Sequence, residues 1–267
     1  MALPAGIEKI LLQVVDFIFM LWPRQLPAPH RLRACKIVSH RGEHDNIRVY
    51  ENTMTAFDSA LAHGTWGIEF DVRWTRDLQP VVAHDPDLKR VFGIETTIAA
   101  VDFKQLRSCC PQVPLLSEVV AKYGRQIHLM VELKEEIYPD PELQNAIFQD
   151  CFASLEPGKD YHLMSLTPAM FDLVTFAPPS AFIPIAMLDM DRYSKLALDK
   201  KYGGVAGHYL LLTNAMLHKH RRCGQSVGTG YPGSKNCLLR EVNRGVEWIF
   251  SNNAGELMAI IDKLIHR

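Results

Sequence analysis

What this 267-residue sequence lacks already excludes several classes of protein. Its six cysteines form no Cys-x-x-Cys pair and no framework spacing, which argues against a zinc finger and a disulfide-stapled domain. Reduced thiols, and therefore a cytoplasmic location, are the expectation. The formal net charge of -1 gives no excess of positive charge, so a nucleic-acid partner is not expected.

The chain also has no Pro/Ser-rich linker and no run of like charges that would divide it into two globular parts. We therefore predict a single domain over residues 31–267. An N-terminal amphipathic helix and a connector are expected to precede it, over residues 1–30. The 48% hydrophobic content is enough for one large buried core.

Polar side chains are present where short apolar segments end. Residues 36–39 form a β-rich run that stops at His40, and residues 67–74 alternate in the manner of a strand. Because successive side chains of a strand point to opposite faces, Glu69 and Asp71 share one face. The two carboxylates are therefore expected to converge.

A third carboxylate comes from the next strand of this kind, over residues 127–134. The same alternation places Glu132 and Lys134 side by side at its end. Three clustered carboxylates repel one another and raise each other's pKa, so they need a cation to stay ionised. Oxygen ligands favour a hard divalent ion such as magnesium, calcium or manganese.

Two histidines lie beside charged partners at strand ends, His40 next to Arg41 and His84 next to Asp85. With an ordinary pKa near ~6.5, they can act as a general acid and a general base at neutral pH. Arg41 and Lys134 add fixed positive charge. A divalent ion with arginine and lysine suits phosphate, because charge develops on the non-bridging oxygens. The residues therefore indicate phosphodiester cleavage.

The order of these motifs resembles that of the glycerophosphodiester phosphodiesterases. The family pattern runs His-Arg-Gly, Glu-Asn-Thr, Glu-x-Asp-Val, His-Asp and Glu-x-Lys, and this chain has all five elements between residues 37 and 134. As a set at these spacings they are far more specific than any one of them. The five elements begin at His40, Glu51, Glu69, His84 and Glu132.

The resemblance implies a role for each matched residue. The implied ligands of a magnesium or calcium ion are Glu69, Asp71, Glu132 and Glu51, the last as a supporting or direct ligand. The implied general acid and base are His40 and His84. The implied substrate-binding residues are Arg41 and Lys134, at the phosphate, and Asn52, as a positioning group.

The later strands depart from the family pattern, which has a tryptophan-containing strand and a final strand that ends in Thr-Asp-x-Pro. The matching places in this chain are residues 227–231 and 249–252. Tyr231 is expected to replace the aromatic side chain that packs against the glycerol, which makes it a further substrate-binding candidate.

Strands and helices alternate along the chain as in a TIM (β/α)8 barrel of the α/β class, which takes about 250 residues. Beyond residue 134, strands are expected over residues 161–166, 182–188, 204–210, 226–230 and 246–250. Helices are expected over residues 141–155, 168–176, 194–202, 214–222 and 255–265. Residues 86–111 are expected to form one small helix, around residues 102–107, and a low roof over the site.

The apolar N-terminal helix, over residues 7–22, must bury its face, and two burials stay open. Polar residues interrupt the segment, which argues against a helix that spans a membrane and against a signal peptide. Pro23 ends the helix. We favour packing across the end of the barrel at which the strands begin. The alternative is peripheral contact with a membrane through residues 5–22, since Trp22 suits a lipid interface.

Three functions stay open on the sequence alone. The first is metal-dependent hydrolysis of a small phosphodiester, a glycerophosphodiester, to glycerol 3-phosphate and an alcohol. The second is a lysophospholipase D-type reaction on substrates that keep an acyl chain. The third is a catalytically weak protein that binds a phosphorylated headgroup. Two histidines that flank a metal favour an enzyme, because a pure binder has no need for them.

Overall fold

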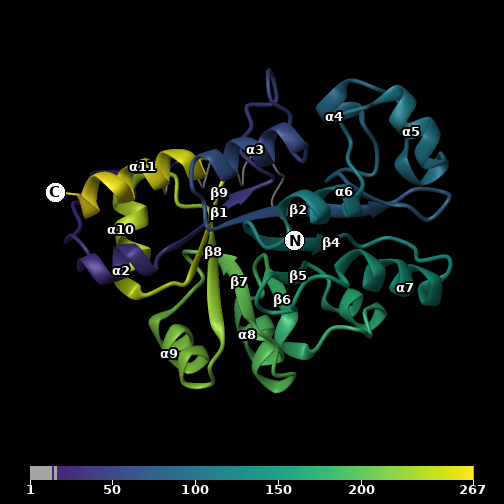
Figure 1. Cartoon of the computed structure of the whole chain (residues 1–267). Helices are drawn as coiled ribbons and strands as arrows, with labels where there is room; N and C mark the ends of the chain where they lie inside the picture. The colour runs from purple at the N-terminus through teal and green to yellow at the C-terminus, as the bar shows by residue number, and fades with distance from the viewer. Residues whose placement is uncertain (1–13, 15–16, 267) are drawn as a thin grey trace.

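The computed structural model describes residue 14 and residues 17–266, and parallel strands close into a barrel at its centre (Figure 1). In chain order the barrel strands are β1 (Lys36–His40), β2 (Gly67–Trp74), β4 (His128–Leu133), β5 (Tyr161–Ser165), β6 (Phe182–Ala186), β7 (Gly204–His208), β8 (Ser226–Gly230) and β9 (Trp248–Ser251). The barrel is closed because β1 pairs in parallel with both β2 and β9. The expected TIM-like α/β barrel is therefore confirmed.

Helices lie outside the barrel and return the chain to the start of the next strand (Figure 1). They are α2 (Pro29–Ala34), α3 (Met54–Ala62), α6 (Leu116–Tyr123), α7 (Pro141–Phe152), α8 (Met190–Asp199), α9 (Asn214–Arg222), α10 (Lys235–Arg244) and α11 (Ala254–Ile265). The predicted bounds of β8 and α9 are confirmed. The helix expected over residues 168–176 is a 3-10 segment, η2 (Pro168–Leu173), and a second, η3 (Pro179–Ala181), leads into β6.

The barrel strands are buried on both faces, as expected for parallel strands covered by helices. On the outer face of β2, Phe70 packs against Phe57 of α3, with ring centroids 5.6 Å apart. Phe57 in turn packs against Tyr123 of α6. Inside the barrel, Met130 belongs to a second cluster, which consists of seven buried apolar residues. Alternation along β2 therefore sends its apolar side chains outward and its carboxylates inward.

An insertion between β2 and α6 is more structured than the sequence suggested. β3 (Pro80–Val82) pairs antiparallel with the end of β2. After it come α4 (Lys89–Phe92), η1 (Ile98–Ala100) and α5 (Phe103–Cys109), where the sequence analysis expected one small helix. The insertion has a small apolar core of its own, which includes Leu88, Ile98 and Leu106. Segments of three or four residues are too short to show helical periodicity, which explains the error.

Most of the expected N-terminal helix lies outside the described residues, so its burial is only partly visible. Residues 17–21 are helical. The carbonyl of Met20 accepts a hydrogen bond from the Asn236 side chain of α10, and Phe19 packs edge-on against Tyr209 after β7. The described part thus lies beside α10 rather than across the barrel end where the strands begin. No helix among the described residues is long and apolar enough to cross a membrane.

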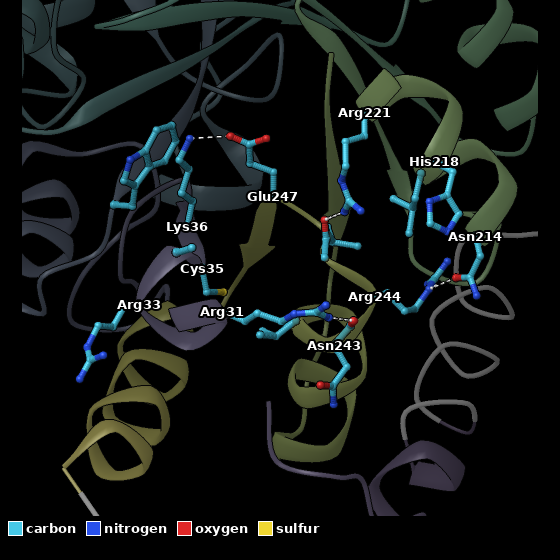
Figure 2. Close-up of a pocket in the computed structure, with 16 residues that line it drawn as sticks. Arg31, Arg33, Cys35, Lys36, Asn214, His218, Arg221, Asn243, Arg244 and Glu247 are labelled. Carbon is cyan, nitrogen blue, oxygen red and sulfur yellow. Dashed lines mark hydrogen bonds and ion pairs between the residues drawn. The ribbon is translucent and has the colours of Figure 1, made fainter. Parts of the chain in front are cut away.

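A cleft of about 910 Å³ lies where the strands begin, between α2, α9 and the end of α10 (Figure 2). Its lining is basic, but local structure explains the charge. Arg31 donates to the carbonyl of Asn243, and Arg221 donates to the carbonyl of Gly245, both at the end of α10. Unpaired carbonyls at helix C-termini favour such cations. The positive charge of the cleft is therefore explained by arginines that cap the end of α10. The polar motif residues lie at the opposite end of the barrel.

Candidate active site

The register of three neighbouring strands brings the motif carboxylates together. β1 and β2 pair with His40 beside Glu69, and β2 and β4 pair with Asp71 beside Glu132. One carboxylate oxygen from each of Glu69, Asp71 and Glu132 lies within 4.8 Å of the others. All three side chains are buried at the carboxyl ends of their strands, which is where TIM barrels build their active sites.

The electrostatics of this acidic cluster fit a hard divalent cation. Burial, and then the neighbouring Asp71, raise the pKa of Glu69 well above its ordinary value. Burial and Asp71 raise the pKa of Glu132 in the same direction. Oε1 of Glu69 is buried with no hydrogen-bond partner among the described residues. Three convergent carboxylates, one of which has an unpaired oxygen, are a suitable ligand set for magnesium or calcium.

Two cations already lie against the cluster. Nζ of Lys134 is 2.7 Å from Oδ1 of Asp71 and 2.6 Å from Oε1 of Glu132. Nε of Arg41 is 3.3 Å from Oδ2 of Asp71. Burial alone would raise the pKa of Asp71, but the charges of Lys134 and Arg41 outweigh burial and hold it well below its usual range. Asp71 is therefore the anionic centre of the site.

The His-Arg-Gly and Glu-Asn-Thr motifs interlock behind the carboxylates. Gly42 has φ of +77°, and a Cβ there would lie 2.7 Å from the backbone of Ala56, so only glycine fits. The backbone N–H of Asn52 donates to the carbonyl of Arg41. The Asn52 side chain donates to Oδ2 of Asp71 at 2.8 Å. Asn52 therefore orients a cluster carboxylate, and its contact with the substrate stays a prediction.

Glu51 lies outside the group of three convergent carboxylates. Oε1 of Glu51 accepts from Arg41 at 2.9 Å, and Arg90 donates to both of its oxygens, at 2.7 and 3.1 Å. Burial opposes ionisation, but the hydrogen bonds from Arg90 and the charge of Arg41 lower the pKa of Glu51 to about 2. Glu51 therefore supports Arg41, and a direct contact with the ion stays a prediction.

Arg90 is a residue of the site that the sequence analysis missed. It lies on α4 in the insertion, and its Nε also donates to Oδ2 of Asp85 at 2.5 Å. Asp85 pairs through Oδ1 with Nδ1 of His84 at 2.7 Å. The guanidinium of Arg90 therefore connects Glu51, which holds Arg41, with Asp85, which holds His84. No motif signals Arg90, because only the folded insertion brings it to Glu51.

His84 is oriented by its neighbour. Because the carboxylate of Asp85 accepts from Nδ1, the other ring nitrogen is left for the site. Burial lowers the pKa of His84, and the charge of Asp71 opposes that shift. The hydrogen bond to Asp85 also stabilises a protonated ring.

His40 is held by an amide. Nδ1 of His40 lies 2.6 Å from Oδ1 of Asn252, which follows β9, so Nδ1 donates and Nε2 is an acceptor. Nε2 lies 3.2 Å from the hydroxyl of Tyr231 and 3.7 Å from Oε2 of Glu69. Burial, and then the charge of Arg41, lower the pKa of His40 to about 3. Asn252 lies where the last strand departs from the family pattern, and no motif signals its contact with His40.

Both histidines therefore lie beside the acidic cluster, His40 next to Glu69 and Tyr231, and His84 close enough to interact electrostatically with Asp71. Every motif residue expected at the site is at this end of the barrel. The model for the glycerophosphoryl diester phosphodiesterase family matches residues 40–200, which include all of these motifs. The chain belongs to this family.

Individual members of the family match over shorter segments. A glycerophosphodiester phosphodiesterase of Bacillus altitudinis is 32% identical over 125 residues, which cover 42% of this chain and 50% of that protein. A human lysophospholipase D is 34% identical over 125 residues, 40% of this chain and 39% of that protein. The matched part thus spans half or less of these relatives.

Solved structures of the family share the fold over most of the chain. A glycerophosphodiester phosphodiesterase of Thermotoga maritima aligns with a TM-score of 0.71 and 20% identity, over 85% of this chain and 98% of that one. A phosphodiesterase of Oleispira antarctica, solved with the product sn-glycerol-3-phosphate, aligns with a TM-score of 0.66 and 20% identity. That alignment covers 89% of this chain and 97% of the Oleispira chain.

Proposed function

We propose that this protein hydrolyses glycerophosphodiesters to glycerol 3-phosphate and an alcohol, with a divalent metal ion. The observation that carries the proposal is that His40 and His84 both lie beside the convergent carboxylates. Nε2 of His40 is 3.7 Å from Glu69, and His84 is close enough to interact electrostatically with Asp71. Family membership supports the reaction class, and the product bound to the Oleispira relative supports glycerol 3-phosphate as the product.

Glu69, Asp71 and Glu132 would hold magnesium or calcium, which supplies Lewis-acid stabilisation of charge on the phosphoryl oxygens. Lys134 and Arg41 would complete the positive surface for the phosphate. Some of their N–H groups would then donate to the substrate in place of the carboxylates. Tyr231 would pack against the glycerol beside His40.

The partners of the two histidines divide the proton transfers between them. His40 bonds an amide that carries no charge and keeps Nε2 as an acceptor, so it suits the general base. His84 bonds the carboxylate of Asp85, which stabilises a ring that holds a proton. His84 would therefore protonate the oxygen of the departing alcohol.

A direct assay tests the proposed function. Release of glycerol 3-phosphate from glycerophosphocholine and glycerophosphoethanolamine should be abolished by a chelator and restored by magnesium or calcium. Glu69→Gln, Asp71→Asn and Glu132→Gln should each lose divalent-ion affinity in calorimetry. Unchanged ion binding in all three variants would contradict the ligand set, and binding without turnover in the wild type would favour a headgroup-binding protein.

We also propose a cytoplasmic location, which is supported by the free state of all six cysteines. Fractionation of cells that express the full chain would test this, together with the peripheral membrane contact through residues 5–22 that stays a prediction. Recovery of the protein in the membrane fraction would favour the contact.

A further inference from the structure

The loop that carries His84 lies outside the closed barrel. His84 follows β3, a strand of three residues at the edge of the sheet, whereas the acidic cluster lies on barrel strands. Just before His84, the backbone N–H of Ala83 donates to the carbonyl of Asp71 at 3.0 Å. A general acid must stay within hydrogen-bond reach of the oxygen that it protonates. Because so short an edge strand gives little support to the loop after it, the position of His84 depends on side-chain contacts.

Arg73 of β2 makes one of these contacts. Alternation along β2 places Arg73 on the same face as Glu69 and Asp71, two positions beyond Asp71. Its Nε donates to the backbone carbonyl of His84 at 2.7 Å. A hydrogen bond from a charged donor is stronger than one between neutral groups. Arg73 therefore fastens the backbone of His84 to the strand that carries two of the proposed metal ligands.

Glu136 in turn holds Arg73. Oε2 of Glu136 accepts a hydrogen bond from Nη1 of Arg73 at 3.2 Å, and Oε1 accepts one from the backbone N–H of Trp74 at 2.9 Å. Glu136 lies two positions beyond Lys134, in the loop after β4. The ion pair therefore connects the end of β2, the loop of His84 and the loop that follows Lys134.

Two different parts of His84 are held in place. Asp85, which Arg90 holds, accepts from Nδ1 of the ring and so sets the orientation of the ring. Arg73 bonds the backbone carbonyl and so sets the point from which the ring projects. The side chains of Arg73 and Glu136 are only 12% and 17% exposed, so water and salt screen this pair less than a surface pair. The backbone contact therefore has the strength to restrain the loop.

We propose that Arg73 and Glu136 are positioning residues, which hold His84 where it can protonate the departing alcohol. The proposal rests on the proposed function, in which His84 is the general acid. In that step the bond between phosphorus and the alcohol oxygen breaks, and this oxygen takes a proton from His84. The attacking oxygen bonds to phosphorus and gives its proton to His40. A catalytic group misplaced by about 1 Å can cost about 100-fold in rate, so the restraint on the loop affects turnover.

Two replacements of Arg73 separate its hydrogen bond from its charge. Arg73→Met removes the charge and places a methyl group where Nε donates. Arg73→Gln removes the charge but keeps an N–H donor at the same distance along the side chain. For glycerophosphocholine we expect Arg73→Met to lower kcat by about 10- to 100-fold, and Arg73→Gln to stay within about threefold of the wild type. KM should stay near the wild-type value in both variants, because the proposed role involves no contact with the substrate.

A second substrate shows whether the loss concerns proton transfer to the leaving group. The p-nitrophenyl ester of glycerol phosphate has a leaving group that needs little protonation, so Arg73→Met should lose at most about threefold in kcat on this ester. His84→Ala is the reference variant and should show the same selective loss. Arg73→Met added to His84→Ala should lower kcat no further, because Arg73 acts through His84.

A double variant and a control account for effects on folding. Burial raises the pKa of Glu136 and the charge of Arg73 opposes that shift, so Arg73→Met leaves a carboxylate without its cation. Arg73→Met/Glu136→Gln removes both charges and keeps an acceptor for the N–H of Trp74, so it carries the same test if Arg73→Met does not fold. Arg107→Met is the matched control. It removes an arginine–glutamate pair with Glu118 between α5 and α6, and kcat on both substrates should stay within about twofold.

The outcomes separate this proposal from the proposed function. Wild-type kinetics of Arg73→Met, equal losses on the two substrates, or equal losses in Arg73→Met and Arg73→Gln would each overturn the positioning role and leave the phosphodiesterase intact. A raised KM in both variants would show that the charge of Arg73 binds the phosphate instead. If His84→Ala lost both substrates equally, the general-acid role in the proposed function would be wrong, and the variant with both replacements would still show whether Arg73 acts through His84. A wild type that cleaves neither diester would refute both proposals.

Discussion

At the residue scale, Asn252 determines which charge faces His40. An amide oxygen accepts the hydrogen bond of Nδ1 but offers no negative charge to a protonated ring. A carboxylate in the same place would favour the protonated form. The family pattern has aspartate at this position, so the chain differs from it at a group that touches a proposed catalytic residue.

We predict that Asn252→Asp raises the pKa of His40 and therefore moves the acid limb of the kcat/KM profile to higher pH. The base must be neutral to accept a proton, so a raised pKa removes active enzyme at pH values where the wild type still works. Asn253→Asp adds the same charge one residue further along and is the control. A profile of Asn252→Asp that overlies the wild type would contradict the assignment of His40 as the base.

Arg90 is the second residue whose removal is informative. We predict that Arg90→Met lowers kcat by about 10- to 100-fold, the usual scale for a group that orients catalytic residues, because Glu51 and Asp85 lose their common partner. Arg90→Lys should recover part of the loss, since it keeps the charge but not the forked geometry.

The control for Arg90 is Arg76→Met, which removes an exposed ion pair with Asp102 in the same insertion. Exposed pairs contribute little, so its turnover should stay within about twofold of the wild type. Equal kinetics of Arg90→Met and the wild type would show that the insertion does not support the site.

At the scale of elements, β4 and β5 carry a pair of histidines that the proposed reaction does not use. Nε2 of His128 lies 2.8 Å from Nδ1 of His162, and Nδ1 of His128 bonds the carbonyl of Lys159. Burial, with His162 as the next cause, lowers the pKa of His128 to about 3. Burial, with Lys36 next, lowers the pKa of His162 to about 4. Both rings are therefore neutral in the folded state.

These shifts predict a loss of stability in mild acid. In the unfolded chain the two histidines have a pKa of ~6.5, so below that pH they bind protons there but not in the folded protein. The free energy of unfolding therefore falls between about pH 6.5 and 4. At pH 5 the loss is about 2 kcal/mol for each histidine. Urea unfolding at pH 7 and pH 5 measures it.

The matched variants for this prediction are His128→Gln/His162→Gln and His30→Gln. The double variant should weaken the pH dependence, although it also lowers stability at pH 7, while His30→Gln at an exposed position of α2 should not change it. A double variant with the full wild-type slope would show that other groups cause the acid loss.

Sequence reasoning was most successful where one element decides the outcome. The alternation of residues 67–74 predicts that Glu69 and Asp71 share a face, and the bounds of β8 and α9 follow from local patterns. It failed where partners meet only after folding. Arg90 reaches Glu51 across 39 positions of sequence, through helices too short to show a period. The place of Glu51 among the ligands came from the resemblance, and no local pattern could show that two arginines would occupy its oxygens.

At the scale of the whole molecule, the N-terminal segment is the part least tied to the chemistry. We predict that deletion of residues 1–22 leaves kcat for glycerophosphocholine within about twofold, since the site begins at His40. The free energy of unfolding should fall by about 1–2 kcal/mol, because Phe19 and Met20 lose their contacts with Tyr209 and α10.

Co-sedimentation with liposomes separates the two burials of this segment. Lower stability with unchanged co-sedimentation supports packing on the protein. Unchanged stability with lost co-sedimentation would support the membrane contact and contradict the packing. Trp22→Ser, at a side chain that is 65% exposed, tests the lipid contact without removing the packed residues.

Closure of the barrel by β9 also determines the order in which parts of the site form during synthesis. His40 and its partner Asn252 are 212 positions apart, and β1 cannot complete its pairing until β9 has left the ribosome. The acidic cluster, by contrast, needs only β1, β2 and β4, which are all made before β5 to β9. A nascent chain can therefore assemble its carboxylates long before His40 is oriented, so catalysis begins only when synthesis of the last strand is complete.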